Sequence, residues 1–236
     1  MNRKFLLDSL DGMKSLVLDL IDPAIKANIG SIPMTTDGPW NNSEMKIYEK
    51  IVGIPHERTY WKIGNFLNVP LAGNPAERNS WLRSVASLKE KYIWLDPDTG
   101  FYNHHTSSSD KMLLVNELLC LASRKEALIV YRHQYWPNPK PEEIPDPVIP
   151  YVWHGLTLLQ DAGLKCFAYQ SQSASFFFVS NTQEKLQVLW ECLYSSMRGV
   201  DVSVIDRRLV KIEDLGSEGK WGKGVRSQNL TEIWDQ

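Results

Sequence analysis

Two carboxylates separated by one proline follow an apolar run in the middle of the chain. The run Tyr92-Ile-Trp-Leu95 leads directly into Asp96-Pro-Asp98, with Thr99 and Gly100 next. Two close carboxylates repel each other, so such a pair favours protonation of one acid or binding of a cation. Mg²⁺ prefers carboxylate oxygens and often contacts a substrate phosphate as well. We therefore predict that Asp96 and Asp98 are catalytic and bind Mg²⁺; in the alternative interpretation they only cap backbone amides in a favourable turn.

Histidine and lysine residues near this turn could serve the same chemistry. His104 and His105 stand in the following loop, and His104 is predicted to contact substrate, although exposed loop histidines are common. Lys111 begins the next apolar segment, where it could pair with Asp98 or a phosphate, or remain an ordinary surface lysine. His133 ends a second apolar run and is predicted to be catalytic, unless it only bonds a backbone carbonyl.

Three further residues are candidates for substrate binding. Asp37 follows a short segment with β-branched residues and is succeeded by Gly38, Pro39 and Trp40. Most of the nine tryptophans are expected to close the core, but a flat ring near a loop can also line a ligand pocket. Glu117 lies among apolar residues of a predicted helix, and a buried acid needs a partner. A structural ion pair is therefore the alternative to substrate binding for Glu117.

Alternating apolar segments must position these side chains. Helical periodicity predicts an opening helix that Asp22-Pro23 ends, a helix with a Ser43 N-cap, and a helix after Ser107 that is apolar around nearly its whole circumference. Six prolines make residues 136–150 an extended loop that could cover the sheet edge. The predicted helices span residues 4–21, 43–53, 74–88, 110–124, 151–161 and 182–197, and the predicted strands span 28–36, 92–95, 127–131, 164–169 and 175–180, with further short strands at 59–63 and within 200–212.

This order of elements predicts an α/β fold with a mostly parallel, Rossmann-like sheet covered by helices and closed by an antiparallel hairpin. We expect one domain over residues 1–215 and a glycine-rich, mobile tail over 216–236. Ligands of such sheets bind outside the carboxyl ends of the strands. That rule places Asp37, Asp96 and His133 on one edge of the sheet, together with Asp98.

Composition limits the classes of function. The 26 basic and 28 acidic residues give a formal net charge of −2, so no global field favours nucleic acid, although a local basic patch would still bind it. Cys120, Cys166 and Cys192 are widely spaced and are expected to be free, buried thiols in a reducing compartment. No apolar run is long enough to span a membrane and no signal peptide is evident, so a cytoplasmic location is predicted.

Four ordered motifs resemble those of a family of uncharacterised bacterial proteins, over roughly residues 4 to 135. The resemblance implies importance for Asp37, Trp40, Asp96, Asp98, Lys111, Glu117 and His133, but it implies no reaction. Thr99 and Arg132 depart from the family pattern, which has Asn and Gln at these places. The motifs are Leu6-Leu-Asp-Ser-Leu-Asp-Gly-Met-Lys14, Pro33-Met-Thr-Thr-Asp-Gly-Pro-Trp40, Trp94-Leu-Asp-Pro-Asp-Thr-Gly100 and Val130-Tyr-Arg-His133.

Two broader resemblances suggest functions. The Asp-Pro-Asp turn is similar to the Asp-x-Asp metal motif of Toprim domains, although residues 29–36 lack the expected glutamate. The Asp-Pro turn and the closing hairpin resemble Rossmann-type methyltransferases that act on nucleic acids, although the glycine-rich first turn is missing. No P-loop, G-x-S-x-G or metal-spaced Cys/His motif is present.

The leading hypothesis is a Mg²⁺-dependent enzyme, a nuclease or phosphohydrolase, that acts on a nucleic acid or nucleotide. The alternatives are a divergent methyltransferase-like enzyme and a non-catalytic protein that binds a protein partner.

Overall fold

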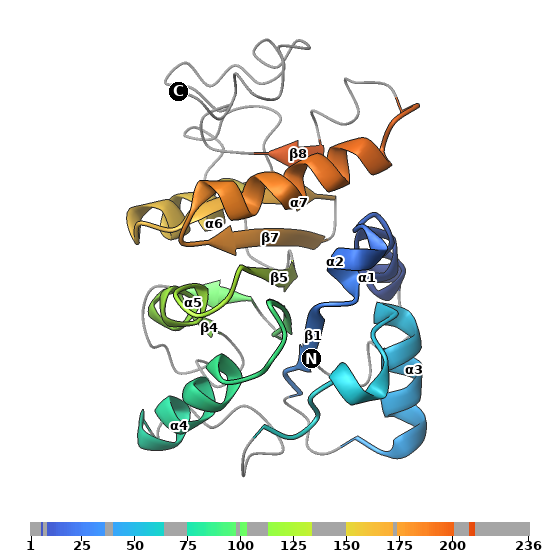
Figure 1. Ribbon diagram of the computed structural model, residues 1–236, viewed down its shortest axis with the longest axis vertical. Helices are drawn as coiled ribbons and strands as arrows, with labels where there is room; N and C mark the ends of the chain where they lie inside the picture. Colours follow the sequence, from blue (N-terminus) through green and yellow to red (C-terminus); the bar gives the residue numbers. More distant parts are fainter. Residues whose placement is uncertain are drawn as a thin grey trace.

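Six strands form one sheet in the part of the chain that the structure describes (Figure 1). The computed structural model describes residues 6, 9–35, 40–63, 75–97, 100–102, 113–133, 150–171, 174–200 and 208–210. The strand order is β1-β2-β5-β7-β6-β8, and β3 (Phe101–Tyr102) and β4 (Leu113–Leu114) form a separate pair. The six strands are β1 (Ile29–Pro33), β2 (Tyr92–Asp96), β5 (Ala127–His133), β6 (Lys165–Gln170), β7 (Ala174–Ser180) and β8 (Leu209–Val210).

The sheet is parallel over its first three strands and antiparallel beyond them. Strand β2 pairs in parallel with β1 on one side and with β5 on the other. Strand β7 runs antiparallel to both β5 and β6, and β8 runs antiparallel to β6. The predicted mixed α/β class is confirmed. The carboxyl ends of β1, β2 and β5 meet at one edge, because Pro33 is in register with Asp96, and Leu95 with Val130.

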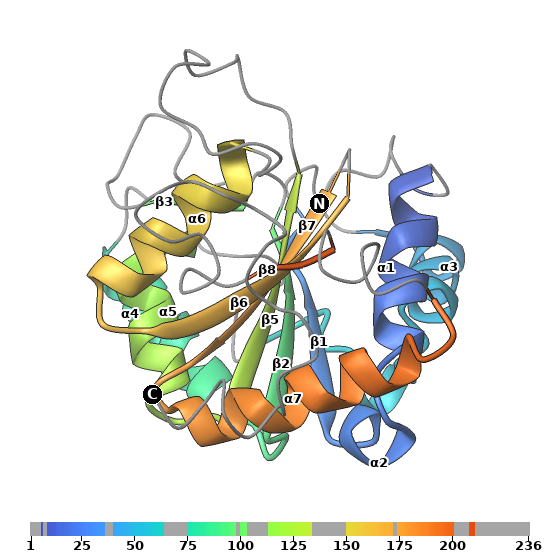
Figure 2. The ribbon, with the colours of Figure 1, turned by 90° about the horizontal axis from the view of Figure 1, so that it is seen from above.

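Helices cover both faces of the sheet (Figure 2). Alternate residues of β2 face opposite ways, so Trp94 packs with α1, α3 and α7, while Ile93 and Leu95 pack with α4, α5 and α6. Burial on both faces explains why β2 and β5 are almost continuously apolar. The helices are α1 (Ser9–Asp19), α2 (Pro23–Lys26), α3 (Asn42–Val52), α4 (Pro75–Ala86), α5 (Val115–Ala122), α6 (Pro150–Asp161) and α7 (Gln183–Ser196), with a short 3₁₀ turn η2 (His56–Arg58).

The N-cap of helix α3 lies two residues before the predicted one. Asn41, not Ser43, is its N-cap: the Asn41 side chain accepts hydrogen bonds from the backbone N–H groups of Ser43 and Glu44. The Glu44 side chain accepts in return from the Asn41 N–H, which completes a capping box. The predicted end at Gly53 is confirmed, since its φ of 62° is the left-handed conformation that glycine adopts easily.

Helix α5 is shorter and less buried than predicted. Leu113 and Leu114 belong to strand β4 instead, and the Leu113 N–H donates to the Gly100 carbonyl. The predicted cap before Asp110 lies outside the described residues. Leu119 is 40% exposed, so α5 has one face open to solvent instead of being packed on all sides. The predicted strand at 59–63 is not continuous: Thr59 forms an isolated bridge with Ser31, and Ile63 is a separate bridge residue.

The cysteines and the membrane prediction can also be compared with the structure. All three cysteines are free, as predicted, but none is fully buried: Cys120 is exposed, and Cys166 and Cys192 are only partly buried. None of the helices in the described ranges is both long enough and apolar enough to cross a membrane. Most of the loop at 136–150 and the tail from 216 lie outside the described residues.

Candidate functional site

Asp96 is buried at the carboxyl end of β2, at the sheet edge predicted for the site. Its side chain is only 1% exposed, and its Oδ2 lies 3.0 Å from the Nζ of Lys14 on α1. The other oxygen, Oδ1, is also buried and has no hydrogen-bond partner among the described residues. A buried carboxylate oxygen without a partner is costly. This oxygen is therefore where a ligand would be expected to bind.

Lys14 lies between two aspartates. Its Nζ is 3.2 Å from the Oδ1 of Asp11, one turn earlier on α1, and 4.4 Å from the ring centre of Tyr131 on β5. Asp11 and Lys14 are each only 3% exposed. The three charged side chains Asp11, Lys14 and Asp96 form a buried cluster, here called the Asp–Lys–Asp triad, with a formal charge of −1. It joins α1 to the end of the central strand β2.

The triad keeps the lysine charged. Burial acts to lower the pKa of Lys14, but the charges of Asp96 and Asp11, with their hydrogen bonds, outweigh it and raise the pKa above its ordinary 10.5. A lysine with a raised pKa is a poor base and a poor nucleophile at neutral pH. Lys14 therefore acts through its positive charge, by holding Oδ2 of Asp96 in place and so fixing the direction of Oδ1.

A tyrosine on α3 completes the polar surroundings of Asp96. The Oη of Tyr48 accepts a hydrogen bond from the Trp94 Nε1–H at 3.0 Å and lies 3.2 Å from the Oγ of Ser31. Burial, followed by the negative charge of Asp96, raises the pKa of Tyr48 well above its ordinary 10.0. The phenol thus stays protonated, and its proton can be directed to Ser31 or towards the carboxylate.

Trp40 lies in the core beside this cluster. Its ring is 4% exposed and packs against Tyr48 and Trp61, at centroid distances of 6.3 Å and 5.7 Å. The Trp61 Nε1–H donates to Glu49 of α3, which fixes the far side of the aromatic group. This arrangement fits the core-closing role expected for most of the tryptophans. It leaves little of the Trp40 ring exposed for contact with a substrate.

Glu117 lies on the opposite face of the sheet and is fully paired. Both of its oxygens accept from the Arg78 guanidinium of α4, one of them at 2.7 Å from Nη2. One of these oxygens also accepts from the Leu114 N–H at 2.8 Å and so caps α5. The structural ion pair, which was the alternative interpretation of Glu117, is what the structure contains.

The remaining predicted residues cannot be compared with these contacts. Asp37, Asp98, His104 and Lys111 lie outside the described residues. Only the backbone of His133 is described: it ends β5 and is in register with Ala174 of β7. Among the described residues, no group of three or more His, Cys, Asp or Glu side chains is arranged to hold a metal ion.

Sequence reasoning missed Lys14 and Asp11 as parts of the site. The available signal was their position: Asp11, Lys14, Leu18 and Ile21 follow a helical spacing of three and four residues, and the last two are core residues. Charged side chains on the apolar stripe of a helix must be paired when that stripe is buried. The pairing partner, Asp96, is 82 residues away, so the spacing could not identify it.

A second carboxylate with an unpaired oxygen lies at the other end of β2. Glu90 is 4% exposed, and its Oε2 accepts from the Tyr60 hydroxyl at 2.7 Å, while Oε1 has no partner in the described part of the chain. Lys125 crosses the same region and donates to the carbonyl oxygens of Leu88 and Glu90. This cluster joins loops at the amino ends of the strands, away from the edge where ligands of parallel sheets bind.

No family model matches the chain, and comparisons with curated proteins and with solved structures find no match. The geometry at Asp96 is therefore the basis for a functional proposal.

Proposed function

We propose that the protein is an enzyme that acts on a nucleic acid or a nucleotide, with Mg²⁺ bound by Asp96 and Asp98 at the carboxyl edge of the sheet. The observation that carries this proposal is the buried Oδ1 of Asp96, which has no partner among the described residues. The position supports it too, since Asp96 ends a central strand flanked by two parallel neighbours. A hard cation or an N–H or O–H donor is what such an oxygen requires.

The charge of the triad determines how a metal ion would bind. Lys14 already neutralises one of the two aspartates, so the triad alone offers a single net negative charge. A single net negative charge attracts a divalent ion only weakly, and the ammonium group of Lys14 repels it. Mg²⁺ binding therefore needs the second carboxylate, from Asp98, and the oxygens of a substrate phosphate. We expect Mg²⁺ and a phosphate-bearing substrate to bind cooperatively.

The other predicted residues have roles in the same proposal. Asp37 and His104 help to bind the substrate, and His133 or Lys111 acts near the transferring group. Trp40 is left out, because its ring is 4% exposed and packs in the core. A bound Mg²⁺ ion would polarise a phosphoryl oxygen or activate a water molecule. Glu117 is left out, because Arg78 and the Leu114 N–H occupy its oxygens.

The test measures thermal stability with Mg²⁺, with a nucleoside triphosphate, and with both together. Ligands at about 100 times their Kd stabilise a protein by about 2.7 kcal/mol, which raises Tm by roughly 5–10 °C at this chain length. We expect the largest rise when Mg²⁺ and nucleotide are both present, and no rise in the Asp96→Asn variant. Asp19→Asn is the control, because Asp19 is an exposed aspartate of α1, the helix that carries Lys14, and it pairs with Lys26 instead of Lys14. Equal responses of both variants and the unaltered protein would refute a role for Asp96.

A second candidate is a methyltransferase-like enzyme on a Rossmann-like scaffold. Strand β7 runs antiparallel between β5 and β6, and Asp96-Pro97 ends a central strand, which together resemble the order of elements in Rossmann-type methyltransferases. In this case Oδ1 of Asp96 would accept a hydrogen bond from an amino group of the substrate. Stabilisation by S-adenosylmethionine without any response to Mg²⁺ would favour this candidate over the first.

A further inference from the structure

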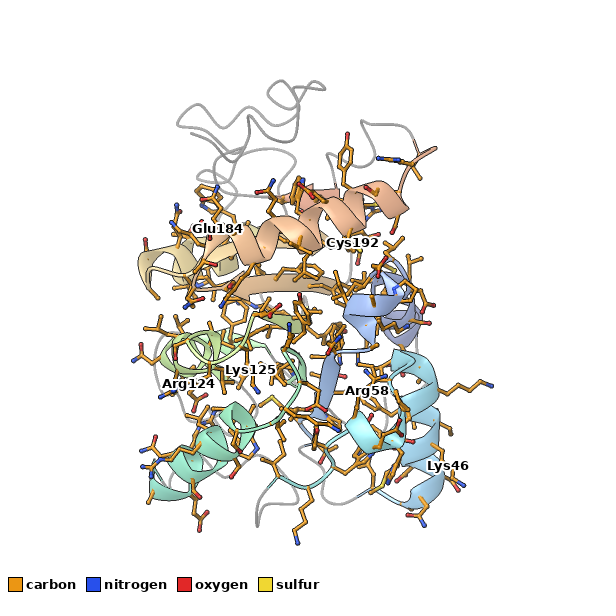
Figure 3. All side chains as sticks on the ribbon, viewed as in Figure 1. Lys46, Arg58, Arg124, Lys125, Glu184 and Cys192 are labelled. Carbon is orange, nitrogen blue, oxygen red and sulfur yellow. The ribbon has the colours of Figure 1, made fainter. Side chains whose placement is uncertain are left out.

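A groove lies between the α1–α2 corner and α7, on the same face of the sheet as the triad but towards the opposite edge. It has a volume of about 530 Å³, within the usual size range of ligand sites. Its position is marked by Cys192, which lies on α7 beside α1 and α2 (Figure 3). The α1–α7 groove is lined by Asp19, Ile21, Asp22, Pro23, Ile25, Val188, Glu191, Cys192, Ser195 and Ser196.

Hydrogen bonds join the two walls of the groove and fix their relative position. The Asp22 N–H donates to the Sγ of Cys192 at 2.8 Å, and the Ser196 hydroxyl donates to the Leu20 carbonyl at 2.6 Å. The Cys192 thiol also donates to the Leu20 carbonyl, at 3.6 Å. A preformed surface loses less conformational entropy when a partner binds.

The thiol itself is part of this bracing. Burial raises the pKa of Cys192, so the sulfur remains a protonated donor instead of a reactive thiolate. The groove is therefore interpreted as a binding surface and not as a redox site.

The groove combines an apolar wall with uncompensated negative charge. Val188 is 50% exposed and Ile25 is only partly buried, so both present apolar surface to the groove. Three carboxylates line the groove, and none of its described lining residues is basic. Asp19 is neutralised by Lys26 at 2.7 Å.

The other two carboxylates have neutral partners only. Asp22 accepts from the Ala24 N–H, and Glu191 accepts from the Gln187 side chain. Neither forms an ion pair with any residue in the described ranges, so both charges remain available to a ligand.

We propose that the α1–α7 groove binds a basic segment of a partner protein, with an apolar side chain against Val188 and Ile25 and lysine or arginine side chains beside Asp22 and Glu191. The two free carboxylates supply the complementary charge, and the exposed valine supplies the apolar contact that an isolated acidic surface lacks. The same charges repel an anionic membrane or a nucleic acid. This surface is separate from Asp96, so it does not depend on the proposed enzymatic function.

The experiment measures fluorescence anisotropy of a labelled hexapeptide, Lys-Trp-Lys-Leu-Arg-Lys, against the full chain. The control peptide has glutamate in place of each basic residue. We expect saturable binding of the basic peptide at concentrations below about 1 mM, weakened by added salt, and no binding of the acidic one.

Two variants and two matched controls locate the binding. Asp22→Asn with Glu191→Gln should weaken binding about tenfold; asparagine still caps α2, so the corner keeps its fold. Val188→Ser should weaken it about threefold. The controls are Glu184→Gln, at the other end of α7, and Leu119→Ser, a comparably exposed aliphatic residue on α5; both should bind within about twofold of the unaltered chain.

Three results would overturn the proposal. One is no binding of the basic peptide below about 1 mM. Another is equal weakening by the groove variants and their controls. The third is a dimer of this chain that the Asp22→Asn, Glu191→Gln variant dissociates, since that would assign the groove to a second copy.

Discussion

Replacing Lys14 with methionine should destabilise the protein far more than the loss of an ordinary ion pair. The substitution keeps most of the side-chain length and removes the only charge that neutralises Asp11 and Asp96 in the triad. Two carboxylates with side chains less than 5% exposed would then lose the cation that they share. Either both stay charged in a dry environment, or one must take up a proton.

The magnitude follows from the contact distances and the burial. At 3.0 Å and 3.2 Å, and with an effective dielectric constant of about 20, each ion pair contributes roughly 5 kcal/mol of attraction before desolvation is subtracted. Removing one partner of a buried pair costs about 3–5 kcal/mol overall. For a domain of this length the cost corresponds to a Tm lower by about 6–20 °C.

Urea denaturation followed by circular dichroism gives the free energy of unfolding. Lys26→Met is the matched control, because Lys26 also pairs with an aspartate of α1, but Asp19 has a side chain that is 64% exposed. This control should cost less than about 1 kcal/mol. The double variant Lys14→Met, Asp96→Asn should be more stable than Lys14→Met alone by about 2 kcal/mol, since it no longer buries an unpaired Asp96 charge. If Lys14→Met costs no more than Lys26→Met, the reasoning about the triad is wrong.

Three further predictions concern pH, packing and a second buried ion pair. Because the pKa of Lys14 is raised in the folded protein, its contribution to the free energy of unfolding is complete below pH 10.5 and is lost as pH rises through the folded pKa. The free energy of unfolding, measured in urea at increasing alkaline pH, should therefore fall less steeply in Lys14→Met than in the unaltered protein. The fall that remains includes a similar contribution from Tyr48, whose pKa is also raised. Gly100→Ala should cost about 2–4 kcal/mol in urea denaturation, because φ is 94° and the new Cβ would lie 2.5 Å from a side-chain carbon of Arg132. The control is Gly163→Ala, which should cost only about 1–2 kcal/mol, because φ is 82° but no atom lies within 4 Å of the new Cβ. Equal costs of the two substitutions would contradict the packing argument. Arg78→Met should lower stability by about 3–5 kcal/mol by leaving Glu117 without its cation, and a change below 1 kcal/mol would show that this pair is not structurally important.

Much of the fold could be predicted because burial determines the pattern of β2 and β5. Strands covered on both faces need nearly continuous apolar residues, and Tyr92–Leu95 and Ala127–Tyr131 have them. The start of α5 could not be predicted, since Leu113 and Leu114 fit a helix as well as a strand. Leu113 and Leu114 form a strand because they pair with β3, and this pairing is a tertiary contact that the local sequence does not show.

The position of Asp96 could be predicted, but its partner could not. A carboxylate that follows an apolar strand must lie at the strand end, and the parallel register brings that end beside its neighbours. Lys14 reaches Asp96 from α1 across 82 residues of chain. The sequence shows only that Lys14 stands on the buried stripe of its helix; which charge it meets depends on how α1 packs on the sheet.

The contrast between two buried carboxylates separates a structural role from a functional one. Glu117 has every oxygen occupied, by Arg78 and by the Leu114 N–H, so its network is complete within the protein. Asp96 has one oxygen held by Lys14 and one buried oxygen without a partner among the described residues. Stability alone would favour pairing both oxygens, as at Glu117, because an unpaired buried acceptor costs free energy. The incomplete pairing of Asp96, at the sheet edge where ligands of parallel sheets bind, is the physical reason to expect that a ligand completes it.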